Sequence, residues 1–165
     1  MLLSGNTLDI RAPGTQVTTR DLAIWGAWTV GAANGLVGLF GAVRWYRFAP
    51  SREFWFGVRG GQALALAYAL VVAAAALGHD HPASSLYYLY ALLPIAIGFV
   101  AEQLRLVAAD QVLSTRGLEN AQAVATLEPA DQQAIVTAIL RREMGVMALA
   151  ALVVCVLALR AAGTY

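Results

Sequence analysis

Charged residues that could do chemistry gather in two segments of the chain. Glu102 and Arg105 stand three residues apart, and Arg141, Arg142 and Glu143 are consecutive. Helical i,i+3 spacing lets Glu102 pair with Arg105, and an antiparallel neighbour would bring the second group opposite the first. At membrane depth such a cluster would serve as a proton or anion relay. We favour an ion-pair clasp between two helices, because these residues flank apolar runs rather than interrupt them. The predicted clasp consists of Glu102, Arg105, Arg142 and Glu143.

Histidine occurs at two positions only, His79 and His81, on either side of Asp80. Two imidazoles and a carboxylate are ligands that zinc or copper accepts. Neighbours across a tight turn supply only part of a coordination shell, however, and no Cys-rich or Met-rich segment lies nearby. We therefore predict a polar turn and no metal or other cofactor, with His79 and His81 as weak metal candidates.

Motifs of known membrane enzymes are absent from the sequence. It contains no GxSxG nucleophile elbow, no HExxH helix and no GxxxxGK[ST] phosphate loop. None of the apolar runs holds a histidine, which excludes a haem held between two buried histidines. None holds a central charged residue of the kind that proton-coupled carriers use. We predict no catalytic residue, and an enzyme is the less favoured class.

The composition is that of an integral membrane protein. Of the 165 residues, 59% are hydrophobic and 13% are charged, whereas a soluble domain carries about 25% charged residues. The formal net charge of +1 offers no basic surface for nucleic acid. All eleven cations are arginine, which we interpret as the codon bias of a GC-rich genome, and we expect a bacterial cytoplasmic membrane protein.

Four runs are long and apolar enough to cross a hydrocarbon core of about 30 Å as helices. We predict one all-α domain, an antiparallel bundle of four transmembrane helices. Its parts are a polar tail over 1–20, spans over 22–43 and 60–78, and longer helices over 83–115 and 129–161.

The third and fourth helices are predicted to continue beyond the bilayer. After Glu102, apolar residues keep a helical spacing at positions 104, 107, 108, 112 and 113. Residues 118–127 form the connection, with room for one short helix, and Glu128–Pro129 carries the signal for a helix start. The expected result is a cytoplasmic helical hairpin.

The segment 44–59 fixes the expected orientation, because it carries four arginines and six aromatic rings between two uncharged runs. Trp and Tyr favour the headgroup layer, and arginine-rich connectors stay in the cytoplasm. We predict that this segment lies along the inner membrane surface, with segment 102–143 also cytoplasmic and both termini outside. The residues expected to contact anionic headgroups are Arg44, Trp45, Arg47, Arg52, Trp55, Arg59, Arg105, Arg141 and Arg142.

Small residues line one face of the first span. Gly31, Gly35 and Gly38 recur at helical spacing, which lets another helix approach closely, either within the monomer or across a subunit interface. Asn34 is a polar group at mid-depth and is expected to bond across helices.

Three function classes follow from this pattern. The favoured class is a non-catalytic accessory or scaffold subunit of a membrane complex, since glycine-faced helices and a projecting hairpin suit protein contacts. The first alternative is a channel or transporter protomer that makes its pore as a homo-oligomer. The second is an enzyme or sensor that acts on lipid or quinone through the inner arginines.

Overall fold

The computed structural model describes residues 18–77, 84–118 and 121–165, which are helical apart from short turns. The helices are α1 (Thr19–Tyr46), α2 (Arg52–Leu77), α3 (Leu86–Thr115), α4 (Ala121–Ala125) and α5 (Pro129–Ala162). All except α4 are long and apolar enough to cross a membrane. Most of the predicted tail, and the His79–Pro82 turn, lie outside the described residues.

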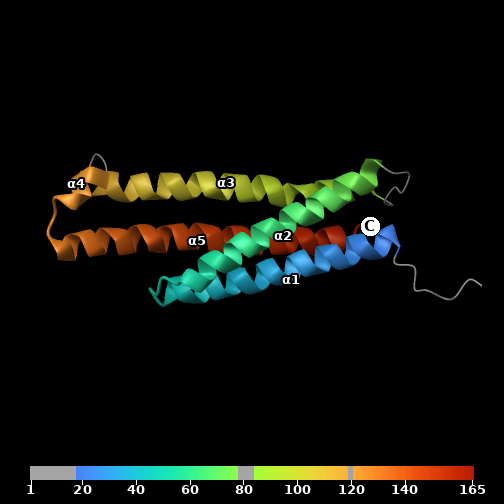
Figure 1. Cartoon of the computed structure of the whole chain (residues 1–165), viewed down its shortest axis with the longest axis horizontal. Helices are drawn as coiled ribbons and strands as arrows, with labels where there is room; N and C mark the ends of the chain where they lie inside the picture. The colour runs from blue at the N-terminus through green and yellow to red at the C-terminus, as the bar shows by residue number, and fades with distance from the viewer. Residues whose placement is uncertain (1–17, 78–83, 119–120) are drawn as a thin grey trace, which may run out of the picture.

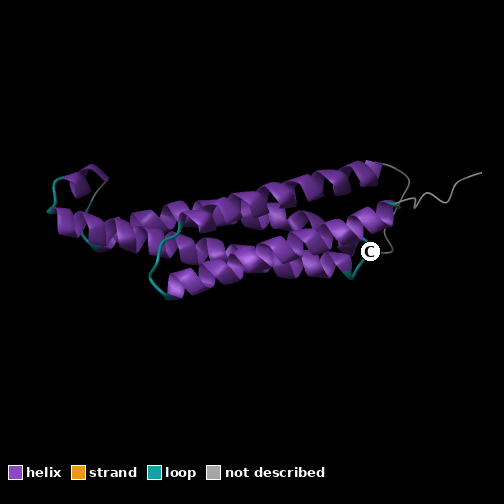
Figure 2. Cartoon of the chain, turned by 60° about the horizontal axis from the view of Figure 1, so that its bottom comes forward, coloured by secondary structure: helices purple, strands orange, loops and turns teal. Residues whose placement is uncertain are grey.

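The four long helices lie along a common direction (Figures 1 and 2). α5 packs against both α1 and α3, while α2 runs obliquely from the end of α1 toward the start of α3 (Figure 1). α4 is the short helix expected between 118 and 127, and it lies at the far end of the α3–α5 pair.

The connection between α1 and α2 is shorter than the segment 44–59 that separates the predicted spans. α1 continues to Tyr46 and α2 begins at Arg52, so only residues 47–51 form a turn. Nor is the segment wholly superficial, because the Phe54 side chain is fully buried. The physical reason is that arginine and aromatic residues are compatible with a helix, so the two helices extend past the apolar runs.

Ser51 marks the start of α2. Its hydroxyl accepts a hydrogen bond from the Phe54 backbone N–H at 3.2 Å, which satisfies one of the free donors of the first turn. The same hydroxyl donates to Glu53 Oε2 at 2.6 Å and thereby lowers the pKa of that exposed carboxyl. At the start of α1, Thr18 and Asp21 cap each other's backbone N–H groups in a capping box.

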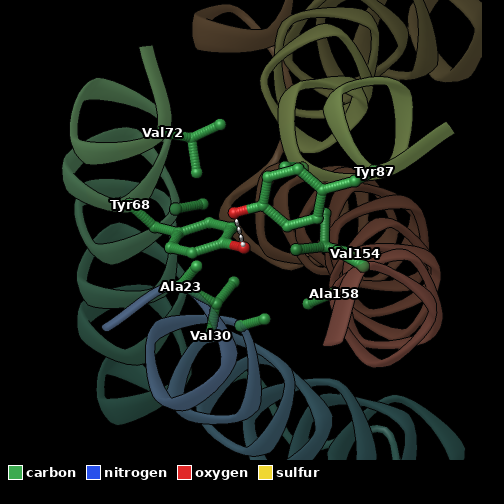
Figure 3. Packing of buried hydrophobic residues seen from close by; sticks show 11 residues of the cluster. Ala23, Val30, Tyr68, Val72, Tyr87, Val154 and Ala158 are labelled. Carbon is green, nitrogen blue, oxygen red and sulfur yellow. Dashed lines mark hydrogen bonds between the residues drawn. The ribbon is translucent and has the colours of Figure 1, made fainter. Parts of the chain in front are cut away.

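Two clusters of buried residues hold the helices together. The larger one joins α1, α2, α3 and α5 near the chain's C-terminus, and its centre is a hydrogen bond of 3.1 Å between the hydroxyls of Tyr68 and Tyr87 (Figure 3). The Tyr165 ring packs edge-on against Tyr87 at 4.8 Å. The smaller cluster, around Phe54 and Met144, lies near the α1–α2 turn.

α3 and α5 extend beyond the α1–α2 turn. Arg141 of α5 stacks on Phe48 in that turn, and Arg105 of α3 faces Trp55. At 1.5 Å per residue, the helix beyond these contacts, to Thr115 in α3 and Pro129 in α5, adds about 15–18 Å to each. The expected apolar stripe is confirmed in part: Ala108 and Val112 are buried, whereas Leu104 and Val107 are exposed.

Candidate functional site: a polar cluster at one end of an apolar groove

A network of polar side chains joins α2 to α3 near the α1–α2 turn. One guanidinium nitrogen of Arg59 donates to Glu102 Oε1 at 2.6 Å and to Gln62 Oε1 at 2.7 Å. The Gln62 amide in turn donates to Glu102 Oε1 at 3.0 Å. Arg105 Nε lies 3.6 Å from Glu102 Oε2, an ion pair too long for a hydrogen bond. We call Arg59, Gln62, Glu102 and Arg105 the polar cluster.

The polar cluster differs from the predicted clasp in its partners. Glu102 pairs with Arg59 of α2, 43 residues away, as well as with Arg105. The Glu143 carboxylate is close enough to interact electrostatically with Arg105 and Glu102. In the described part of the chain, Arg142 forms no ion pair and its side chain is exposed. The shorter ion pair of the cluster, between Arg59 and Glu102, therefore joins α2 to α3.

Several arginines expected at lipid headgroups turn toward aromatic rings of the protein. Arg141 lies over the rings of Phe48 and Trp45, at 3.4 and 5.4 Å from their centroids. Arg105 lies 5.4 Å from the Trp55 ring. Cation–π contacts of this kind contribute about 0.5–2 kcal/mol each, so these two arginines fasten helices together.

Of the other arginines predicted at the membrane interface, one contacts the protein and the rest are wholly or partly exposed. Arg44 donates to the Pro50 carbonyl at 3.4 Å and lies 6.0 Å from the Phe40 ring, so it braces the turn. Arg47 and Arg52 are exposed on either side of that turn. Arg59 keeps half of its side chain exposed even though it belongs to the polar cluster.

A groove of about 260 Å³ runs between α2 and α3, with its floor on α1 and α5. Leu66, Ile95 and Phe99 form its exposed rim, while Pro94 and Gly98 form its inner wall. Gln62 and Glu102 of the polar cluster stand at one end, so the groove passes from a charged end to an apolar end over about eight residues of α3, or about 12 Å.

Asn34 lies at the base of the groove and is 5% exposed. Its amide nitrogen donates to the Val30 carbonyl at 3.0 Å and, across helices, to the Gly61 carbonyl at 3.4 Å. None of the hydrogen bonds found among the described residues ends at its amide oxygen, Oδ1. Asn34 therefore joins α1 to α2, and its Oδ1 lies so close to Gly61 that a Cβ there would stand 2.7 Å from it.

The glycine face of α1 packs against α5. A Cβ at Gly31, Gly35 or Gly38 would meet Leu159 at 3.2 Å, Cys155 Sγ at 3.0 Å or Leu152 at 2.7 Å. The close helix approach expected from this face is thus present within the monomer. The bulky side of α1, which includes Trp25, Trp28 and Leu36, faces outward.

The described residues contain no group of three or more His, Cys, Asp and Glu side chains that could hold a metal ion. The metal candidates His79 and His81 lie outside the described ranges.

The comparisons with known proteins add no family. No protein-family model matches the chain, and neither the curated proteins nor the solved structures contain a match.

Sequence reasoning missed the groove and the role of Gln62. The available signal was the pair of polar residues Gln62 and Glu102, each next to a run of small or apolar residues. That signal does not say which helix faces meet, so it could not place them side by side.

Proposed function

We propose that the chain is a non-catalytic subunit of a membrane complex and that its α3–α5 extension contacts a partner protein on the cytoplasmic side. The observation that carries the proposal is the continuation of α3 and α5 beyond the α1–α2 turn (Figure 1). We call this part, residues 106–115 and 129–140, the arm.

The dimensions support a projecting arm. α3 has 30 residues and α5 has 34, which correspond to about 45 and 51 Å of helix. A hydrocarbon core is about 30 Å thick, so each helix is longer than the membrane requires. α1 ends and α2 begins at the level of Arg105 and Arg141. These two arginines flank the last apolar residues of the spans in α3 and α5.

The arginine distribution supports a cytoplasmic arm. With four spans and the α1–α2 turn inside, the inner segments hold eight arginines and the outer ones three. Cytoplasmic segments of membrane proteins carry such an excess. The inner arginines are 44, 47, 52, 59, 105, 116, 141 and 142.

The arm surface suits a protein partner. Leu106, Val107 and Val136 are about half exposed there. Outside the hydrocarbon layer, apolar side chains of this size gain free energy when a partner covers them. A channel formed through the glycine face of α1 is less favoured, because α5 already occupies that face.

A photocrosslinking amino acid at Val136 tests the proposal in the native membrane. The matched control is the same amino acid at Val156, which lies on the same helix within the apolar span and is also exposed. We expect an adduct with one protein of defined mass at Val136, lost when Val107 is changed to Glu, and no such adduct at Val156. Adducts only with copies of the chain itself, or equal adducts at both positions, would refute the proposal.

A further inference from the structure

The tip of the arm carries a hollow of about 450 Å³ beside the last turn of α3. Its polar lining comes from Asp110 and Ser114, and its apolar lining comes from Leu113 and Leu118. Gly117 completes the lining and leaves the hollow open, because a Cβ there would meet no atom within 4 Å. A cavity of about 150 Å³ already admits a benzene molecule, so this hollow has room for one long side chain.

Asp110 is the charged residue of the hollow, and its charge is not balanced within the arm. None of the ion pairs or hydrogen bonds found among residues 18–77, 84–118 and 121–165 involves its carboxylate. Arg105 and Arg116 stand five residues before it and six after it, whereas charges on a helix pair at spacings of three or four. The last carbonyls of α3 add a partial negative charge beside the hollow. Both features favour a cation as the ligand.

The hollow continues the exposed apolar surface of the arm. Four exposed residues recur at helical spacings of three or four and so share one face of α3, namely Leu106, Val107, Asp110 and Ser114. The opposite face of α3 buries Ala108. Along the exposed face, the apolar residues lie next to the span, and the carboxylate lies about one turn, or roughly 5–6 Å, further from it.

We propose that Asp110 binds a lysine or arginine side chain of the partner protein, from the cytoplasmic segment that adjoins one of the partner's own transmembrane helices. The inference rests on the proposed function of the arm. A partner in the same membrane presents apolar residues at the end of its span and then an excess of Lys and Arg. This order matches that of Leu106, Val107 and Asp110 on α3. The aliphatic stem of the bound residue packs on Leu113 and Leu118, and its charge pairs with the carboxylate.

A photocrosslinking amino acid at Ser114, which lines the hollow and is exposed, tests the inference in the native membrane. The adducts are digested and mapped by peptide mass spectrometry. We expect the point of attachment on the partner to lie within one helical turn, about four residues, of a lysine or arginine. Attachment to a segment without such a residue, or to a second copy of the chain, would overturn the inference.

Three variants of the same crosslinking protein measure the part played by the charge. Asp110→Asn removes the charge and keeps the size of the side chain, whereas Asp110→Glu keeps the charge. Asp131→Asn is the matched control, because it removes an exposed carboxylate from the same end of the arm but outside the hollow. Circular dichroism first shows that all three fold like the parent.

We expect the adduct yield to fall about fivefold in Asp110→Asn, which corresponds to roughly 1 kcal/mol, the upper end for an exposed ion pair. Asp110→Glu and Asp131→Asn should keep most of the yield. An equal loss in Asp110→Asn and Asp131→Asn would show that only the overall charge of the arm matters, and it would overturn Asp110 as the binding residue.

The result at Val136 separates this inference from the proposed function. An adduct at Val136 with none at Ser114, or a yield at Ser114 that Asp110→Asn leaves unchanged, would overturn the hollow as the site while the partner proposal stands. The absence of adducts at both positions would refute both.

Discussion

The guanidinium carbon of Arg141 lies 3.4 Å from the centroid of the Phe48 ring, and Phe48 itself has a positive φ of 54°. A left-handed backbone costs an L-residue about 1–2 kcal/mol. The cation–π contact offsets a cost of this size. Since Arg141 also faces Trp45, one cation holds the α1–α2 turn against α5.

Two substitutions at Phe48 separate the ring from the backbone. Both Phe48→Ala and Phe48→Gly remove the contact with Arg141, but only glycine adopts positive φ without strain. We expect both variants to be less stable than the parent, with Phe48→Ala less stable than Phe48→Gly by about 1 kcal/mol. Unfolding in SDS–detergent mixtures, followed by circular dichroism, measures the difference. Equal stability of the two variants would show that the turn relaxes to another conformation.

Methyl groups added at two glycines should change stability in opposite directions. A Cβ at Gly41 would collide with the Phe54 ring and lie 2.9 Å from the Ala148 Cβ, whereas one at Gly60 meets nothing within 4 Å. We expect Gly41→Ala to destabilise by about 1–3 kcal/mol through overpacking. Gly60→Ala should stabilise by roughly 0.5–1 kcal/mol, because alanine favours a helix. The same unfolding assay applies, and a stable Gly41→Ala protein would contradict the close approach of α1 and α5 at this level.

Proline within the arm should unwind it. Ile135 is 1% exposed in α5, and proline there removes a backbone hydrogen bond and strains the helix by about 3 kcal/mol or more. Ala130→Pro is the control, since the first turn of a helix tolerates proline. We expect faster hydrogen exchange over residues 129–143, and faster proteolysis, in Ile135→Pro only. If both variants match the parent, the arm is not a continuous helix.

Cysteine labelling in sealed vesicles tests the orientation. Cys155 is the only cysteine and is first changed to alanine, which is small enough for its position against Gly35. Ser51 is a poor labelling site because it is buried and caps α2, so the exposed Arg47 and Ser85 are changed to cysteine instead. We expect a membrane-impermeant maleimide to reach the two positions from opposite sides. Labelling of both from one side would reverse the assignment of the spans.

The existence of the four long helices could be predicted because uncharged runs of about twenty residues have few alternatives. The start of α5 was predicted from Glu128 and Pro129, and the capping box of Thr18 and Asp21 at the start of α1 is a local signal of the same kind. These signals depend on neighbours in the sequence and so do not require knowledge of the packing.

The α1–α2 connection was harder to predict. Arginine and tryptophan indicate that a segment lies at a membrane interface, but they do not determine whether its backbone is helical. Pro50 followed by Ser51 was the usable signal, since proline ends one helix and serine caps the next. The Arg59–Glu102 pair and the groove could not be predicted from the sequence. They depend on how α2 is rotated about its own axis, and α2 is apolar on nearly every side.

The packing of α1 against α5 has a consequence for synthesis of the protein. α1 leaves the ribosome before α5, so the glycines at 31, 35 and 38 have no final neighbour until α5 has been made. During that interval, which lasts seconds at ordinary elongation rates, lipid or an insertion factor must cover this thin side of the helix. A chain that stalls before α5 would leave this surface of α1 without its neighbour.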